Sequence, residues 1–286
     1  MIIDMRLRPP LPTWVSKPQF NEKATYYPTR VGFPRPPSVA ARSMDLLLKE
    51  MDEAEISWGV VMGRQAAEPF GAIPNDEIAA AVRDHPKRFV AFAGIDVSLP
   101  PEASLNEIRR CMAIPGFKGV SIEPAASKTP MALGDRRLYP IFEECQRLGI
   151  PISVGSSGGM LPGQGAVYEY NSPVHLFNPA KDFPKLKIIV SHGGWPWVRE
   201  LLGIAFTFPN VYVSPDLYLN SPSLPGANEY VMAANMYLGD RLLFGTAYPS
   251  RPLKESVVAF DHWSFAAGIK ERVLGLNALE AMNMAA

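Results

Sequence analysis

Residues 187–194 read Lys-Ile-Ile-Val-Ser-His-Gly-Gly, and this stretch shows the pattern that decides the fold. Its apolar run at 188–190 suits a strand that is buried on both faces, as strands of parallel sheets are. A polar residue, a histidine and two glycines follow at once, as expected where a strand meets a loop. Seven other stretches also read as strands, and we predict eight strands at residues 2–8, 58–64, 88–96, 116–124, 151–157, 187–194, 211–218 and 241–249.

Helical patterns lie between the predicted strands, at residues 39–54, 75–85, 101–112, 135–148, 173–183, 196–206 and 228–237, and two more helices close the chain. This alternation over 286 residues predicts one α/β domain, a (β/α)8 TIM barrel that spans residues 1–286. A doubly wound open sheet is the alternative. It is disfavoured because no Gly-x-Gly-x-x-Gly opens a helix after the first strand.

The composition narrows the possible roles. The 28 Lys and Arg residues balance 28 Asp and Glu residues, and this zero net charge argues against a nucleic-acid or membrane-surface partner. Cys111 and Cys145 fall in predicted helices and indicate reduced thiols rather than a disulfide framework. No signal peptide is evident, and no apolar run approaches the ~20 residues that span a bilayer. We therefore expect a cytoplasmic protein.

The first predicted strand ends in Arg6-Leu-Arg8. Residues two apart on a strand point to the same side, and barrel strands end at the active-site mouth. Two fixed positive charges at this place favour a carboxylate or phosphate over a metal ion, because the guanidinium fork matches such anions. In the alternative arrangement, both arginines are paired internally with Asp4, Glu123 or Asp216.

A long segment at residues 9–37 interrupts the alternation of strands and helices. It contains eight prolines and several aromatic residues, and loops of this length are often functional. Because the segment leaves the top of the first strand, it could cover the pocket as a lid. It could equally act as a clamp over the barrel rim or a neighbouring subunit.

Several motifs resemble those of the amidohydrolase-related family, in the branch of the ACMSD-type decarboxylases. The order and spacing of these motifs carry the resemblance, which covers most of the chain outside residues 9–37. The motifs are Phe117-Lys-Gly-Val-Ser-Ile-Glu-Pro124, Leu138-Tyr-Pro-Ile-Phe-Glu143, Ile188-Ile-Val-Ser-His-Gly-Gly-Trp-Pro-Trp197, Arg241-Leu-Leu-Phe-Gly-Thr-Ala-Tyr-Pro249 and Val273-Leu-Gly-Leu-Asn-Ala278.

The resemblance implies a metal site that this sequence does not reproduce. Metal-dependent members of the family carry His-x-His on strand one, a His on strand five, a His on strand six and an Asp on strand eight. The corresponding positions here hold Arg6 and Arg8, Gly155 or a neighbouring serine, His192, and Ala247. Only His192 remains of that set, and zinc requires three or four ligands. We therefore predict that no metal cofactor is bound.

A rearranged zinc site made of Glu123, His192 and Asp216 is the alternative. One unit charge about 5 Å from a divalent ion costs roughly 6–7 kcal/mol at an effective dielectric constant near 20. Two arginines would cost about 13 kcal/mol, which is comparable to the roughly 10–16 kcal/mol that a good zinc site yields. The arginines therefore argue against the metal.

The predicted site residues lie at the ends of the barrel strands, where the chemistry of this fold is carried out. His192 and Asp216 are the predicted catalytic residues, since a histidine beside arginines favours its neutral form and can act as a base. The predicted substrate-binding residues are Arg6, Arg8, Arg64, Glu123 and Tyr248.

The sequence thus predicts a metal-independent enzyme of the amidohydrolase fold. It would act by hydrolysis of a lactone or another C–O or C–N bond, or by a lyase step, on a small carboxylated molecule. A metal-dependent hydrolase or decarboxylase with a rearranged site, and a non-catalytic carboxylate-binding barrel, are the alternatives. The resemblance also implies a homo-oligomer.

Overall fold

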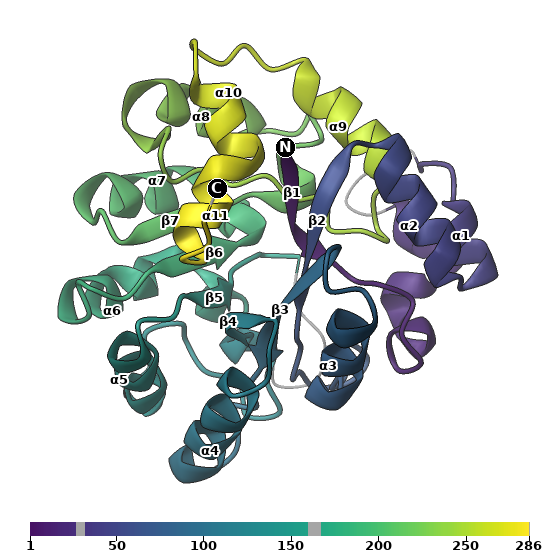
Figure 1. The fold of residues 1–286 in the computed structure, drawn as a ribbon. Helices are drawn as coiled ribbons and strands as arrows, with labels where there is room; N and C mark the ends of the chain where they lie inside the picture. The colour runs from purple at the N-terminus through teal and green to yellow at the C-terminus, as the bar shows by residue number, and fades with distance from the viewer. Residues whose placement is uncertain (27–31, 160–166, 286) are drawn as a thin grey trace.

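The computed structural model describes residues 1–26, 32–159 and 167–285. Within these residues, seven parallel strands form one sheet in which each strand pairs with the next along the chain. The sheet curls around a central axis with helices on its outer side (Figure 1). The strands are β1 Ile2–Leu7, β2 Ile56–Met62, β3 Phe89–Gly94, β4 Phe117–Ile122, β5 Ile152–Gly155, β6 Ile188–Ser191 and β7 Val211–Ser214. This sequential order agrees with the predicted barrel and excludes the doubly wound alternative, whose strand order reverses.

The eighth predicted strand, at residues 241–249, is not a regular strand, and that prediction was wrong in detail. The segment still closes the barrel, because Leu242 bridges to Val213 of β7 and Tyr248 bridges to Leu7 of β1. Between these bridges, Thr246 donates both its backbone N–H and its hydroxyl to the Asp4 carboxylate, at 2.9 and 2.5 Å. A side chain therefore replaces part of the backbone ladder.

Most predicted strands extended too far at their carboxyl ends. β6 ends at Ser191 and β7 ends at Ser214, so His192 and Asp216 follow their strands instead of lying on them. The register pairs Ser191 with Ser214, which brings both strand ends to the same level of the barrel rim. The loops after these two strands therefore start side by side.

The helices follow the predicted places with shifted bounds. They are α1 Pro37–Ala41, α2 Met44–Glu53, α3 Asn75–Asp84, α4 Pro101–Met112, α5 Tyr139–Leu148, α6 Phe177–Asp182, α7 Val198–Thr207, α8 Ala227–Ala233, α9 Leu253–Asp261, α10 Ile269–Glu271 and α11 Asn277–Ala281. The predicted helix at 39–54 is divided, because Arg42 adopts a left-handed φ of 53° and the Ser43 side chain caps the next helix at Leu46 N. Among the described residues, no helix is long and apolar enough to cross a membrane.

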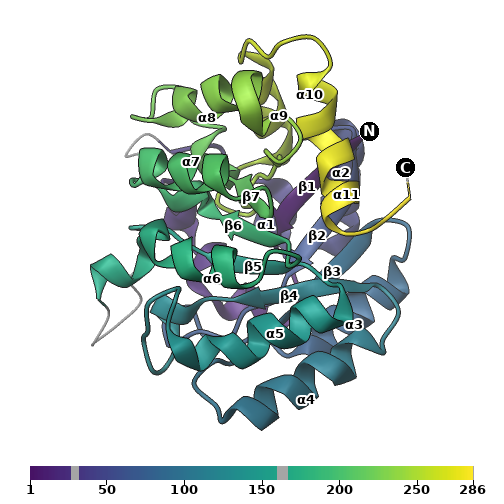
Figure 2. The same ribbon diagram turned by 90° about the vertical axis from the view of Figure 1, so that its left-hand side faces the viewer.

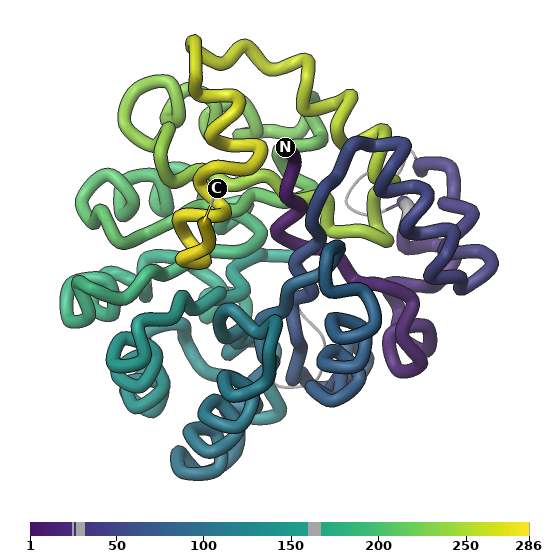
Figure 3. Tube along the Cα trace, viewed as in Figure 1, coloured from purple at the N-terminus to yellow at the C-terminus, as the bar shows by residue number. Residues whose placement is uncertain are grey.

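Two apolar clusters stabilise the barrel. The larger one fills the layer between the strands and the outer helices. The smaller one joins strand residues such as Ile3, Met5 and Phe92 to Ala278 and Leu279 of α11. The C-terminal helices thus return to β1, and both termini lie on the same side of the molecule (Figures 2 and 3). The carboxyl ends of the strands lie at the opposite end of the barrel, where the candidate functional site is found.

The described part of the 9–37 segment is ordered into three short 3-10 turns, at Trp14–Ser16, Pro18–Phe20 and Glu22–Tyr26. Thr13 N–H donates to Glu77 Oε2 of α3 at 3.0 Å, and Lys17 Nζ pairs with Glu68 Oε1 at 3.0 Å. These contacts fasten the segment over the end of the barrel. Residues 27–31 of the predicted loop lie outside the described residues, and α1 begins at the end of the segment, at Pro37.

Candidate functional site

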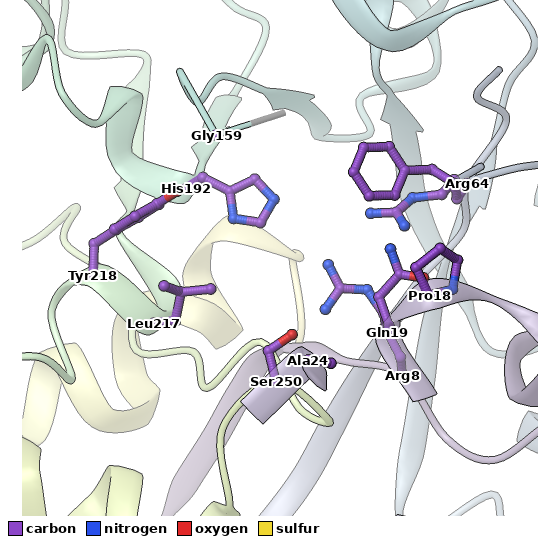
Figure 4. A pocket seen from close by; sticks show the side chains of 11 residues that line it. Arg8, Pro18, Gln19, Ala24, Arg64, Gly159, His192, Leu217, Tyr218 and Ser250 are labelled. Carbon is purple, nitrogen blue, oxygen red and sulfur yellow. The ribbon is translucent and has the colours of Figure 1, made fainter. Parts of the chain in front are cut away.

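A cavity of about 220 Å³ opens at the carboxyl ends of the strands. Its polar lining consists of Arg8, Gln19, Arg64, His192 and Ser250, and its apolar lining includes Phe70, Leu217 and Tyr218. Figure 4 shows the guanidinium groups of Arg8 and Arg64 pointing toward the space in front of the His192 imidazole. The cavity can therefore hold a small ligand between two cations and one titratable ring.

Glu123 lies immediately after β4 and binds two arginines, Arg64 from the cavity wall and Arg6 behind it. Arg6 Nη2 donates to Glu123 Oε1 at 2.8 Å, and Arg64 Nε lies 3.0 Å from Glu123 Oε2. Burial alone would raise the pKa of Glu123, but Arg64, Arg6 and Arg8 together lower it below its ordinary value. Glu123 is therefore an ionised carboxylate that neutralises part of the arginine cluster.

Arg8 is bound differently from the other two arginines. Its Nη1 donates only to the carbonyl oxygens of Ala247 and Tyr248, at 3.2 and 3.4 Å. Within residues 1–26, 32–159 and 167–285, Arg8 forms no ion pair. Its side chain is nonetheless buried, and burial together with repulsion from Arg6 and Arg64 brings its pKa well below the ordinary value. A buried cation that has no carboxylate partner is open to an anionic ligand.

His192 and Asp216 form a pair beside the arginines. Asp216 Oδ2 accepts the backbone N–H of His192 at 3.0 Å and lies 3.2 Å from its Nδ1. The Ser214 hydroxyl donates to Asp216 Oδ1 at 2.6 Å, and Arg6 Nε lies 3.7 Å from Oδ2. A side chain at position 245 would place its Cβ 2.8 Å from Asp216 Oδ1, so Gly245 makes room for this carboxylate.

The protonation states of this pair follow from burial and from the arginines. Burial lowers the pKa of His192, and the charges of Arg6, Arg8 and Arg64 lower it further, well below its ordinary value. Burial also raises the pKa of Asp216, against the opposing effect of Arg6. His192 is thus a neutral imidazole at physiological pH. Its Nε2, buried at the cavity wall, has no hydrogen-bond partner among the described residues.

Three residues at the strand ends adopt left-handed backbone conformations, which non-glycine residues rarely do. The φ angles are 64° at His192, 55° at Asp216 and 58° at Ala247. Such conformations cost of order 1–3 kcal/mol each and gather at functional sites, where the surrounding structure holds them. Here the three residues lie where the chain leaves β6, leaves β7 and crosses the closing segment, and His192 and Asp216 contact each other there.

The predicted site residues do not all face the cavity. Arg8, Arg64 and His192 line it. Arg6, Glu123 and Asp216 lie behind this lining, where Glu123 pairs with Arg64 and Asp216 contacts His192. The side chain of Tyr248 belongs to neither group, because its hydroxyl lies 2.6 Å from Ser38 Oγ in the outer core. The predicted contact between Tyr248 and a substrate therefore has no support in this geometry, although its carbonyl oxygen holds Arg8.

Gln19, Tyr218 and Ser250 line the cavity but were not predicted from the sequence. Gln19 comes from the 9–37 segment and is buried there. Tyr218 stacks on Trp195 at 5.1 Å between ring centroids, and its hydroxyl lies 2.6 Å from Ser157 Oγ. The aromatic and proline content of the segment at 9–37 was a signal that it could cover the pocket, but no pattern identified Gln19.

The residues at the rim do not fit a divalent metal ion. In the part of the chain that the structure describes, no group of three or more His, Cys, Asp or Glu residues is arranged to hold one. Of the rearranged zinc ligands considered above, Glu123 is bound by Arg6 and Arg64, and Asp216 and His192 lie beside Arg6. A cation here would compete with fixed guanidinium charges for the same oxygens.

Comparison with known proteins agrees with this architecture. A sequence model of the amidohydrolase family matches residues 4–282. The chain belongs to the amidohydrolase family. The resemblance drawn from the motifs is therefore confirmed, and so is the TIM-barrel fold, because the barrel superposes on an uncharacterized TIM-barrel protein from Bordetella bronchiseptica. That match has a TM-score of 0.89 and 34% identity, and it covers 99% of this chain and 98% of the other.

Relatives in the amidohydrolase family include enzymes of known reaction. The chain is 27% identical to the 2-amino-3-carboxymuconate-6-semialdehyde decarboxylase of Dictyostelium discoideum, over 85% of this chain and 76% of that protein. Its fold also matches a probable 2-pyrone-4,6-dicarboxylic acid hydrolase from Acinetobacter baumannii, solved with citric acid bound. The TM-score is 0.68 at 14% identity, over 99% of both chains. This amidohydrolase therefore has decarboxylases among its relatives and a probable hydrolase among its structural neighbours.

Proposed function

We propose that this amidohydrolase is a metal-independent hydrolase that opens an ester or lactone bond in a small carboxylated molecule. The observation that carries the proposal is the joint presence, at one cavity, of a neutral His192 and of Arg8, which forms no ion pair within the described residues and donates its hydrogen bonds there to carbonyl oxygens. One group can accept a proton, and the other can bind a carboxylate bidentately. The Dictyostelium relative and the Acinetobacter structural neighbour are both named for carboxylated substrates.

The chemistry would start with water. His192 Nε2 accepts a proton from a water molecule while the water oxygen attacks the carbonyl carbon of the ester. The carbonyl electron pair moves to its oxygen, where the Arg64 guanidinium stabilises the negative charge. When the tetrahedral intermediate collapses, the bond to the ring oxygen breaks, and His192 returns its proton to that leaving oxygen. Asp216 keeps the imidazole oriented through its contact with Nδ1.

Lyase chemistry is the second candidate, because a base beside a cation can also add water to, or remove it from, a conjugated acid. Simple decarboxylation is less well supported by the site. Pairing Arg8 with the departing carboxylate would stabilise the ground state, in which the charge is still localised on that group.

A metal-dependent enzyme and a non-catalytic carboxylate-binding barrel are the alternatives to both candidates. Association of several copies of the chain remains a prediction.

The proposal can be tested with 2-pyrone-4,6-dicarboxylate, a lactone that carries two carboxylates. We expect loss of its ring absorbance on addition of enzyme, at a rate that is unchanged after treatment with a strong chelator. A neutral lactone such as δ-valerolactone should be turned over at least tenfold more slowly. Elemental analysis should find far less than one metal equivalent per chain. Activity that disappears on chelation and returns with zinc or manganese would instead establish a metal-dependent enzyme.

Replacing Arg8 by alanine should weaken carboxylate binding about ten- to a hundredfold, because a charged hydrogen bond contributes about 1.5–3 kcal/mol. The measurement is the Michaelis constant for the dicarboxylate, or its dissociation constant by calorimetry. Arg83, an exposed arginine of α3, provides the matched control, and its alanine variant should bind as the wild type does. Equal affinity in the two variants would show that Arg8 does not contact the ligand.

A further inference from the structure

The cavity wall holds two buried arginines, Arg8 and Arg64, whose positive charges repel each other. Burial lowers the pKa of Arg64 and of Arg8. The charge of Arg6 lowers both pKa values further, and the charge of Arg64 also lowers that of Arg8. Arg64 is anchored by Glu123, whereas the hydrogen bonds of Arg8 within the described residues go to two carbonyl oxygens. Like charges that are buried side by side tend to separate unless another group holds them.

Trp14 is the group that lies against both cations. Its indole is fully buried, with Arg8 Cζ 5.8 Å and Arg64 Cζ 5.3 Å from the ring centroid. Phe70 contacts Arg64 as well, at 5.2 Å. An aromatic face attracts a cation through its quadrupole, and the attraction is stronger where water is excluded. One indole therefore offsets the repulsion between two guanidinium groups.

The indole N–H has no acceptor among the described residues, so Trp14 acts through its ring and not through a hydrogen bond. Hydrogen bonds of the backbone on either side of Trp14 hold the residue in place. Thr13 donates its backbone N–H to Glu77 of α3, and Lys17 donates its own to Trp14 O at 2.9 Å. Gln19, which lines the cavity, follows within the same segment.

We propose that Trp14 is a positioning residue that keeps Arg8 and Arg64 converged on the carboxylate site. The inference rests on the proposed function for the ligand, but its physical basis is the contact with the two guanidinium groups. Trp14 itself does not line the cavity, so it acts through the arginines. The segment at 9–37 thereby contributes to ligand binding from outside the barrel strands.

A double-mutant cycle on stability tests the contact without any ligand. The variants are Trp14→Leu, Arg8→Met and the double variant, measured by chemical denaturation. Trp14→Leu should raise the unfolding equilibrium constant in both backgrounds. The increase should be about 2- to 30-fold larger when Arg8 is present than in the Arg8→Met background, because that factor corresponds to the strength of one cation–π contact. The same cycle between Trp14 and the exposed Arg83 should give no coupling.

Binding of isophthalate, a planar dicarboxylate that cannot be hydrolysed, tests the role. At constant ionic strength, Trp14→Leu should raise the dissociation constant about tenfold, whereas Trp14→Phe, which retains an aromatic face, should raise it about threefold or less. Zero coupling in the cycle, or unchanged affinity in Trp14→Leu, overturns the inference. If the wild type does not bind isophthalate although the coupling is present, the proposed carboxylate site fails while the Trp14 contact is supported.

Discussion

Replacing His192 by asparagine should lower the turnover number by about a hundredfold or more, because general base catalysis contributes typically about 10²–10⁴-fold. Asparagine keeps the size and one hydrogen-bonding group but cannot accept a proton at the position of Nε2. The backbone N–H of residue 192 would still donate to Asp216, so the fold should be retained. The measurement is the steady-state rate with 2-pyrone-4,6-dicarboxylate, together with a circular dichroism spectrum.

The pH dependence of the wild type supplies the second part of this test. His192 acts as a base only when it is neutral, so activity should rise with pH through its pKa and then level off. Since burial and three arginines lower that pKa, the rise should be complete below the ordinary histidine value of 6.5. Activity that rises only above the ordinary histidine pKa would contradict this assignment.

His175 provides the matched control for His192. It is partly buried and lies outside the cavity lining, and its Nε2 lies 3.1 Å from the carbonyl oxygen of Glu169. His175→Asn should therefore keep the wild-type rate and pH profile. If His192→Asn also keeps the wild-type rate, proton transfer belongs to another group, and Asp216 is the next residue to test.

Replacing Glu123 by glutamine should reduce the free energy of unfolding by about 3–5 kcal/mol, the usual cost of removing one partner from a buried ion pair. Glutamine has nearly the same shape but carries no charge, and Arg6 and Arg64 would lose their shared carboxylate. The arginine cluster would then be left with more uncompensated positive charge. Chemical denaturation of the wild type and the variant measures the loss.

Glu144 offers a control with the same chemistry in a different environment. It also binds two arginines, Arg109 and Arg147, but those side chains are 47% and 60% exposed. Pairs with exposed partners contribute about 0–1 kcal/mol each, so Glu144→Gln should cost much less than Glu123→Gln. Similar losses at the two positions would mean that burial does not determine the strength of the Glu123 pairs.

The repeating pattern of apolar runs followed by polar residues was sufficient to predict the barrel. Parallel strands buried on both faces leave a local signal, and their carboxyl ends must meet at one rim. For this reason the sequence could place Arg6, Arg64, Glu123 and His192 near one another. The end of each strand was less predictable. The ladders stop at Ser191 and Ser214, and the residues with left-handed φ angles, His192 and Asp216, follow them in the loops.

The pairing of those side chains depended on the tertiary structure. Arg6 and Arg8 follow the same local rule, yet Arg6 reaches Glu123 and Asp216 while Arg8 faces the cavity. A register shift in the pairing of β1 with β2, between Asp4 and Leu7, alters the simple alternation on which the sequence argument relied. The alternation of side chains along a strand predicts the side to which each side chain points, but it does not predict which residue that side chain will contact.

By itself, the sequence determined the order of strands and helices, the rim at which the polar residues gather, and the two arginines, Arg6 and Arg8, at the end of the first strand. The tertiary structure alone decided that Trp14 contacts Arg8 and Arg64, that Gln19 lines the cavity, and that Tyr248 turns toward Ser38. The physical reason is the range of the interactions. Hydrophobic periodicity is local along the chain, whereas ion pairs, cation–π contacts and burial join residues that only the closed barrel brings together.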